Sequence, residues 1–217
     1  MLKRGFDIIV SFLGLVVLSP ILLVITLMIK MWMPGPVFFK QERTGRYGNP
    51  FVMYKFRTMI ISHNGNSISV KGENRITKLG AKLRKHKLDE LPELLNVLMG
   101  DMSLVGPRPD IPEYSEKLSG EEKLILELRP GLTGPASLKY ANEEEILASV
   151  EDPYEYYDEV IWPEKVRKNL EYYYNRSFTQ DIMLIIKTFV RIGRLDHYLL
   201  MNFFAATILL SEVIVRI

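Results

Sequence analysis

A run of 22 residues without a charged side chain, from Ile8 to Ile29, constrains the fold of this chain more than any other feature. As a helix with a rise of about 1.5 Å per residue, the run is about 33 Å long and can cross the hydrocarbon core of a bilayer. Lys3 and Arg4 precede it, as in a secretory signal peptide. Signal peptides, however, have an apolar region of only ~7–15 residues and a cleavage site of small residues, which does not follow here. Aromatic and basic residues after the run suit a membrane interface, so we expect a retained membrane segment over residues 1–34.

Ser19 and Pro20 lie close to the middle of this run and predict a break in its helix. Pro20 has no N–H, so the carbonyl of Val16 loses its helical partner, and the Ser19 hydroxyl can supply part of the missing hydrogen bonding. Basic residues flank the run on both sides, so the charge bias of membrane topology indicates no direction of crossing. A helix–break–helix that enters the membrane and returns to the same face satisfies both observations. A kinked single span stays open, because transmembrane helices tolerate proline.

The rest of the chain predicts one compact domain that is mostly α-helical with a small β-hairpin. Two β-prone segments, 37–40 and 51–56, are separated by a glycine-containing turn, which predicts the hairpin. Helical patterns follow from residue 76 onward, including Leu91, Leu94, Leu95 and Leu98 at helical spacing before Gly100. The expected fold is a membrane helix, either re-entrant or a kinked single span, attached to a compact α/β domain. Its expected parts are the membrane helix 1–34, the domain 35–198, and a C-terminal apolar helix 199–217 that packs on the membrane or a partner.

Composition excludes several kinds of chemistry. The chain has no cysteine, which removes disulfides, thiolate zinc sites and thiol nucleophiles together. Three scattered histidines, His63, His86 and His197, have no neighbour at ligand spacing, and we interpret them as surface or structural residues. The formal net charge of +2 is too small to indicate a nucleic-acid partner. Any bound metal must be held by oxygen atoms or by these histidines.

Two adjacent carboxylates, Asp89 and Glu90, precede a predicted helix in the segment "LDELPELLNVLMGDMSLVGPRPD". Pro92 belongs in the first turn of a helix, where its missing N–H costs nothing. Asp89 would then be a natural N-cap, and Glu90 would lie in a first turn that favours negative charge. Helix capping therefore explains both carboxylates, and these residues alone favour it.

Basic residues around the two carboxylates permit a second interpretation, in which the pair belongs to a phosphate-binding site. They are Lys55 and Arg57 in "YKFRTM", Lys82, Arg84 and Lys85 before the pair, and Arg108 in "GPRP". Guanidinium groups bind phosphate with two hydrogen bonds, and a helix N-terminus is a further anion site. Arginines near a carboxylate also lower its pKa, which would keep an aspartate ionised as a nucleophile. Such a carboxylate also fits a Mg²⁺ ion bridging to a diphosphate, although an inert surface network of ion pairs stays open.

Several longer motifs resemble a known family. "KRGFD", the "SP" pair, "GPVFFKQERTGRYGNPFVMYKFRTM", "LRKHKLDELPELLNVLMGDMSLVGPRP" and "LRPGLTGPASLKY" occur in this order. Together they are similar to the small monotopic phosphoglycosyl transferases of the bacterial sugar-transferase family, over residues 3 to about 188. The resemblance implies transfer of a sugar-1-phosphate from a UDP-sugar to undecaprenyl phosphate, with release of UMP, at the start of surface-glycan assembly. It also implies a re-entrant helix and a monotopic enzyme at the bacterial inner membrane, with its domain on the cytoplasmic face.

The resemblance assigns roles to particular residues. Asp89 matches the nucleophile of a ping-pong cycle with a covalent phosphosugar intermediate, and Glu90 its partner, which assists proton removal or positions the metal. Mg²⁺ is the implied cofactor, with Asp89 as its ligand. The expected substrate-binding residues are Lys55, Arg57, Arg84, Pro107, Arg108, Pro109 and Arg129. Lys87 replaces a serine that is common in the family. The identity of the transferred sugar and the oligomeric state, including a possible homodimer, stay open. Asp181 is either functional or structural. A lipid-binding scaffold and an isoprenoid-diphosphate phosphohydrolase are the alternative functions.

Overall fold

The computed structural model describes residues 2–60 and 75–191. The predicted loop after residue 60 and the predicted C-terminal apolar helix therefore lie largely or wholly outside the described residues. The helices are α1 Leu2–Trp32, α2 Lys78–Lys85, α3 Glu93–Met99, α4 Pro112–Glu116, α5 Pro135–Lys139, α6 Glu143–Leu147, α7 Pro153–Tyr156, α8 Trp162–Asn175 and residues 178–191. Short helical turns are η1 Arg46–Gly48, η2 Leu88–Glu90, η3 Gly120–Glu127 and η4 Tyr157–Ile161. The strands are β1 Phe38–Thr44, β2 Pro50–Phe56, β3 Ser103–Val105 and β4 Gly131–Thr133.

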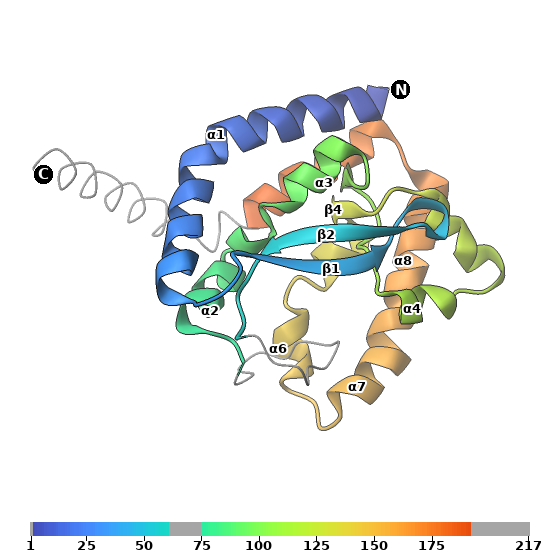
Figure 1. The fold of residues 1–217 in the computed structure, drawn as a ribbon. Helices are drawn as coiled ribbons and strands as arrows, with labels where there is room; N and C mark the ends of the chain where they lie inside the picture. The colour runs from blue at the N-terminus through green and yellow to red at the C-terminus, as the bar shows by residue number, and fades with distance from the viewer. Residues whose placement is uncertain (1, 61–74, 192–217) are drawn as a thin grey trace, which may run out of the picture.

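The mostly helical fold with a small hairpin is confirmed. β1 and β2 pair antiparallel from Phe38 opposite Phe56 to Thr44 opposite Pro50, and they lie below α3 in Figure 1. The buried Asn96 side chain of α3 fixes the helix to β2, because its Oδ1 accepts from Tyr54 N at 3.1 Å and its Nδ2 donates to the Val52 carbonyl at 2.7 Å. The hairpin therefore holds α3 in place, and with it the segment before α3 that carries Asp89 and Glu90.

The buried face of α3 differs from the one that the leucine spacing predicts. Leu94 is buried in a core cluster with Val97, Met102 and Leu104, but Leu95 is 39% exposed, and Leu91 lies before the helix begins. The helix instead buries the polar Glu93 and Asn96 beside Leu94 and Val97. α3 ends at Gly100 in the left-handed region (φ 103°), as the sequence predicts.

The "KRGFD" segment attaches the start of α1 to the rest of the molecule. Both oxygens of the buried Asp7 carboxylate accept hydrogen bonds from β3, one from Ser103 Oγ at 2.8 Å and one from Leu104 N at 3.1 Å. The Arg4 guanidinium donates to the Val97 and Leu98 carbonyls at the end of α3. A polar motif at the edge of a membrane segment thus has a structural explanation.

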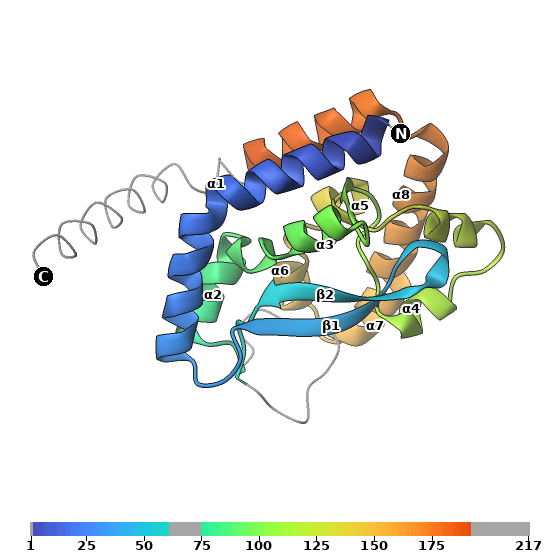
Figure 2. The same cartoon turned by 45° about the horizontal axis from the view of Figure 1, so that its top comes forward.

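Lys3 makes the remaining anchor, to the helix formed by residues 178–191. Its Nζ lies 2.5 Å from Asp181 Oδ2, and the Tyr172 hydroxyl donates to the other Asp181 oxygen. Figure 2 shows the first half of α1 and residues 178–191 side by side. Of the two roles open for Asp181, the structure supports the structural one.

α1 bends near its middle, so that its two halves lie along two sides of the domain (Figure 1). Pro20 lies inside the helix, and the Ser19 hydroxyl donates to the Val16 carbonyl at 2.7 Å, which is the compensation predicted from the sequence. The halves pack on different clusters: residues such as Phe6 and Val10 on the cluster around Val97, and Ile25 and Ile29 on the cluster around Phe56. The bend therefore lets one helix cover two separate apolar surfaces.

Most of α1 faces away from the domain. It is long and apolar enough to cross a membrane, and only 11% of its most apolar window is buried inside the molecule. The exposed apolar side chains are Leu2, Ile8, Ile9, Phe12, Leu13, Val16, Val17, Leu23, Leu27, Met31 and Trp32. A surface of this kind is costly in water, so α1 requires an apolar environment.

The sequence did not predict the parallel pair β3–β4, which joins the "GPRP" and "GLTG" segments. Ser103 lies opposite Gly131 and Val105 opposite Thr133, and Gly106 N donates to the Thr133 carbonyl at 2.9 Å. A Cβ on Gly131 would lie 2.1 Å from Gly106 N, and one on Gly134 would lie 2.2 Å from Gly106 O. The glycines therefore allow two backbones to touch directly, which fixes the loop that carries Arg108.

We predict that Gly131→Ala lowers the free energy of unfolding by about 3 kcal/mol, because the atoms in its way belong to the backbone and cannot move aside. Denaturant titration in detergent micelles measures the change. Gly5→Ala is the matched control, since a Cβ at this position in α1 meets nothing within 4 Å and alanine favours a helix. Equal stability of the two variants would contradict the close packing of these loops.

Candidate active site

Asp89 and Glu90 lie in the short turn η2 between α2 and α3, and neither caps a helix. Pro92 occupies the N-cap position of α3, and no side chain caps either η2 or α3. The Asp89 carboxylate is buried, with 8% of the residue exposed, and its Oδ1 accepts no hydrogen bond from the described residues. The capping interpretation, which the residues alone favoured, is therefore wrong for this pair.

Glu90 is the centre of a cluster of ion pairs drawn from three parts of the chain. Its Oε1 lies 2.8 Å from Lys55 Nζ of β2 and 2.5 Å from an Arg108 nitrogen of the loop after β3. Lys55 Nζ also lies 3.1 Å from Glu93 Oε1 of α3. The cluster holds three carboxylates, counting Asp89, but two cations, and no described residue forms an ion pair with Asp89.

The pKa values of the two neighbouring carboxyl groups are shifted in opposite directions. Burial raises the pKa of Asp89, and the charge of Glu90 raises it further. Burial also opposes ionisation of Glu90, but Arg108 and Lys55 outweigh it and hold the pKa of Glu90 well below its usual range. The sequence predicted that arginines would lower the pKa of the aspartate. That prediction is wrong for Asp89, because the guanidinium bonds to Glu90 instead.

A cavity of about 1810 Å³ reaches from this cluster to α1 and the helix of residues 178–191. Five of the predicted site residues line it: Arg84, Glu90, Pro107, Arg108 and Pro109. At the other end it is lined by Val10, Gly14 and Leu18 of α1 and by Ile185, Ile186, Phe189 and Val190. One continuous space therefore joins charged groups suited to phosphate with apolar groups suited to a lipid chain. Asp89 lies in the chain between the lining residues Lys87 and Glu90.

Two predicted site residues lie elsewhere. Arg57 is buried beneath the end of α1, where its guanidinium donates to the Met33 and Pro34 carbonyls. Arg129 donates through Nε to the Gly100 carbonyl at 2.9 Å, which joins the end of α3 to the start of β4. Neither lines the cavity, and the contacts that the structure shows for both are structural.

Sequence reasoning missed two carboxylates next to the site. Glu93 is 1% exposed, and its position three residues after Glu90 was the available signal, because a carboxylate inside an apolar helix needs a partner. Glu144 of α6 pairs with Arg84 at 2.6 Å. No sequence pattern indicated that pair, since the two residues are 60 positions apart.

The unpartnered Asp89 oxygen fits a Mg²⁺ ion. Burial and the surplus negative charge around Asp89 are conditions that a cation would relieve. Among the described residues, no group of three His, Asp or Glu side chains could hold a metal by itself. Mg²⁺ commonly uses one or two carboxylates together with substrate phosphates and water, so Asp89 would need a phosphorylated substrate to complete the site.

Comparisons with known proteins agree with this geometry. A family model described as bacterial sugar transferase matches residues 1–194. The uncharacterized sugar transferase EpsL of Bacillus subtilis is 36% identical over 187 residues, which cover 86% of this chain and 85% of EpsL. The exopolysaccharide production protein PSS of Rhizobium leguminosarum is 42% identical over 64% of this chain and 74% of that protein. The UDP-glucose:undecaprenyl-phosphate glucose-1-phosphate transferase of Escherichia coli is 36% identical over 87% of this chain, which spans 39% of that protein.

We predict that Asp89→Asn raises the free energy of unfolding at neutral pH by about 1 kcal/mol. Because the folded-state pKa of Asp89 is raised, its ionised form lowers stability as pH rises above the usual aspartate range, and asparagine removes this cost. The gain should therefore shrink as pH falls toward 4. Denaturant titration across pH measures it.

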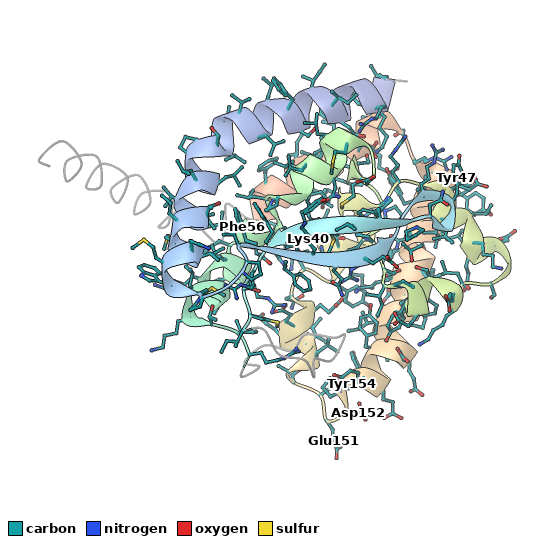
Figure 3. The ribbon with its side chains drawn as sticks, viewed as in Figure 1. Lys40, Tyr47, Phe56, Glu151, Asp152 and Tyr154 are labelled. Atoms are coloured by element: carbon teal, nitrogen blue, oxygen red, sulfur yellow. The ribbon has the colours of Figure 1, made fainter. Side chains whose placement is uncertain are left out.

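Asp152→Ala is the calibrating control, because Asp152 (labelled in Figure 3) is a true N-cap that accepts from Tyr154 N and Glu155 N. Its loss should lower stability by about 1 kcal/mol. If Asp89→Asn lowered stability as Asp152→Ala does, the conclusion that Asp89 neither caps a helix nor has a partner would be wrong.

Proposed function

The chain belongs to the bacterial sugar transferase family, and from this premise we propose that it transfers a sugar-1-phosphate from a UDP-sugar to undecaprenyl phosphate. The reaction releases UMP and is the first membrane step of surface-glycan synthesis. The observation that carries the proposal is the buried, unpartnered carboxylate of Asp89 beside two cations that Glu90 holds in place.

The first step is attack by an Asp89 oxygen on the β-phosphorus of the UDP-sugar. The new bond joins Asp89 to the phosphosugar, the bond to the bridging oxygen breaks, and UMP leaves. Burial has removed the water that would stabilise the Asp89 charge, so the carboxylate is a stronger nucleophile than an exposed one. Lys55 and Arg108 lie where they can neutralise charge on the phosphates.

Glu90 supports this step by position. A carboxyl group whose pKa lies well below its usual range is a weak base, so Glu90 is poorly suited to remove a proton. Its contacts with Lys55 and Arg108 keep both cations beside Asp89 and away from direct pairing with it. Of the two roles that the resemblance leaves open, positioning is therefore the better supported.

In the second step, an oxygen of undecaprenyl phosphate attacks the same phosphorus. The bond to Asp89 breaks, the carboxylate is restored, and the product is the lipid-linked diphosphosugar. The cavity suits this acceptor, because its charged end can take the phosphate while its apolar end, at α1 and residues 185–190, can take the start of the isoprenoid chain. A covalent intermediate lets the two substrates use one site in turn.

We include Mg²⁺ in the proposal, held by Asp89 and the substrate phosphates. When bound it would neutralise phosphate charge and make the β-phosphorus more electrophilic.

The proposed location is the bacterial inner membrane, with both ends of α1 and the domain on the cytoplasmic face. The bend at Pro20 supports a re-entrant helix, and so does the attachment of both halves of α1 to the same domain. The acceptor phosphate lies at the headgroup level, so an active site at that depth meets it without a full crossing.

Two other functions explain part of the molecule. A lipid-binding scaffold accounts for α1 and the basic residues but leaves the buried pair of carboxylates unused. An isoprenoid-diphosphate phosphohydrolase uses the same site but transfers the phosphoryl group to water. The direct test is turnover of radiolabelled UDP-sugars with undecaprenyl phosphate.

We predict lipid-linked diphosphosugar and UMP from this assay, loss of both with a chelator, and their return with Mg²⁺. Asp89→Asn should lower kcat at least about a thousandfold, because it removes the nucleophile. Asp152→Asn should keep full activity, because Asp152 does not line the cavity. Release of inorganic phosphate alone would indicate the hydrolase, and full turnover by Asp89→Asn would contradict the assigned nucleophile.

The re-entrant topology has its own test, because the chain contains no cysteine. Leu2→Cys and Met31→Cys place single thiols at the two ends of α1, where these side chains are 70% and 75% exposed. We predict that a membrane-impermeant thiol reagent labels both from the cytoplasmic side only. Labelling of the two ends from opposite sides would establish a single span.

A further inference from the structure

Lys87 adopts a backbone conformation that is unfavourable for lysine. Its φ of 55° and ψ of 22° lie in the left-handed region, which costs an ordinary side chain free energy that glycine or asparagine avoids. The turn after α3 uses glycine at its left-handed position, with Gly100 at φ 103°. The turn after α2 instead keeps a lysine, two residues before Asp89. Strain of this kind often accompanies a functional position.

The Lys87 ammonium also differs from the other cations near Asp89. Lys55 and Arg108 pair with Glu90, and Arg84 pairs with Glu144. None of the described residues forms a hydrogen bond or ion pair with the Lys87 side chain, which is exposed and lines the cavity.

Backbone hydrogen bonds hold the turn that carries Lys87. Lys87 N donates to the Arg84 carbonyl, and Glu90 N donates to the Lys87 carbonyl. The lysine side chain therefore leaves a hydrogen-bonded turn two residues before Asp89 and lines the cavity. A free ammonium there can reach an anion bound at Asp89 without breaking an existing ion pair.

We propose that Lys87 binds the diphosphate of the donor, as a residue that determines donor affinity in this chain. The proposal rests on the proposed function and adds a contact that the ion-paired cations do not supply. Lys87 contacts substrate phosphate oxygens from the ground state onward, so its loss should raise the KM for the UDP-sugar and change kcat little.

The first experiment measures binding of UDP and UMP by calorimetry to the full-length protein in detergent micelles. Lys87→Met should weaken UDP binding roughly tenfold to a hundredfold, because a hydrogen bond to a charged group is lost, and UMP binding less. Lys87→Arg should restore most of the affinity. Lys123→Met is the control: Lys123 is an exposed lysine of η3 that does not line the cavity, and its loss should leave UDP affinity within about twofold. Equal UDP affinity of wild type and Lys87→Met would overturn the inference.

The second experiment separates function from stability. Asparagine tolerates the left-handed region, so Lys87→Asn should raise the melting temperature by about 2–4 °C while weakening UDP binding and raising the donor KM. Tyr47→Asn is its control, because Tyr47 also has a positive φ, of 60°, and lies at the far end of the hairpin from Phe56 (Figure 3). It should raise the melting temperature with UDP binding unchanged. A structural role alone predicts no change in UDP affinity for Lys87→Asn.

Measurements of turnover then separate the proposed diphosphate contact of Lys87 from the proposed transferase function. A wild-type protein that binds UDP through Lys87 but releases no UMP from UDP-sugars would refute the transferase function and leave the diphosphate contact standing. An active wild type whose Lys87→Met variant keeps its donor KM would refute the contact alone. A rise in the acceptor KM with an unchanged donor KM would assign Lys87 to the acceptor phosphate and overturn the donor assignment.

Discussion

The ion pairs of Glu90 are the interaction on which the rest of the site depends. They join β2 through Lys55, the loop after β3 through Arg108, and the turn before α3 that carries Glu90 itself. Because Glu90 pairs with both cations, the buried Asp89 carboxylate has no ion-pair partner within residues 2–60 and 75–191, and its Oδ1 accepts no hydrogen bond from them. The same arrangement lowers one pKa and raises the other, so two adjacent carboxyl groups acquire different chemistry from their surroundings. Removal of a partner from such a cluster is costly, because it leaves a buried charge uncompensated.

α1 relates this site to the membrane. Its polar start is attached through Asp7 to β3, and β3 leads directly into the loop that carries Arg108. The bend at Pro20 lets both halves of the helix pack on one domain, with apolar side chains left on the outer surface. The cavity extends from Glu90 to the first half of α1, which is the path that the proposed lipid-linked substrate would take to the charged groups. Anchor and active site are therefore parts of one connected structure.

Much of the fold could be predicted because it depends on local pattern. The hairpin, the helix ended by Gly100 and the bend with its Ser19 hydrogen bond all follow from residue types within a few positions of one another. The parallel pair β3–β4 could not, because each strand has only three residues and their contact depends on glycines far apart in the chain. The backbone contacts of Arg57 and Arg129 could not be predicted for a related reason: a guanidinium beside a site in sequence can bond to backbone carbonyls far along the chain.

The sequence by itself determined the apolar helix, its break and the presence of a carboxylate pair among basic residues, since each is a property of neighbouring residues. Its longer motifs also indicated the family, to which a model matching residues 1–194 assigns the chain. Only the tertiary structure decided which carboxylate is paired. Asp89 and Glu90 are adjacent and chemically alike, so local pattern cannot distinguish them. The difference comes from Lys55 and Arg108, which the fold brings from 35 and 18 positions away to the same oxygen of Glu90.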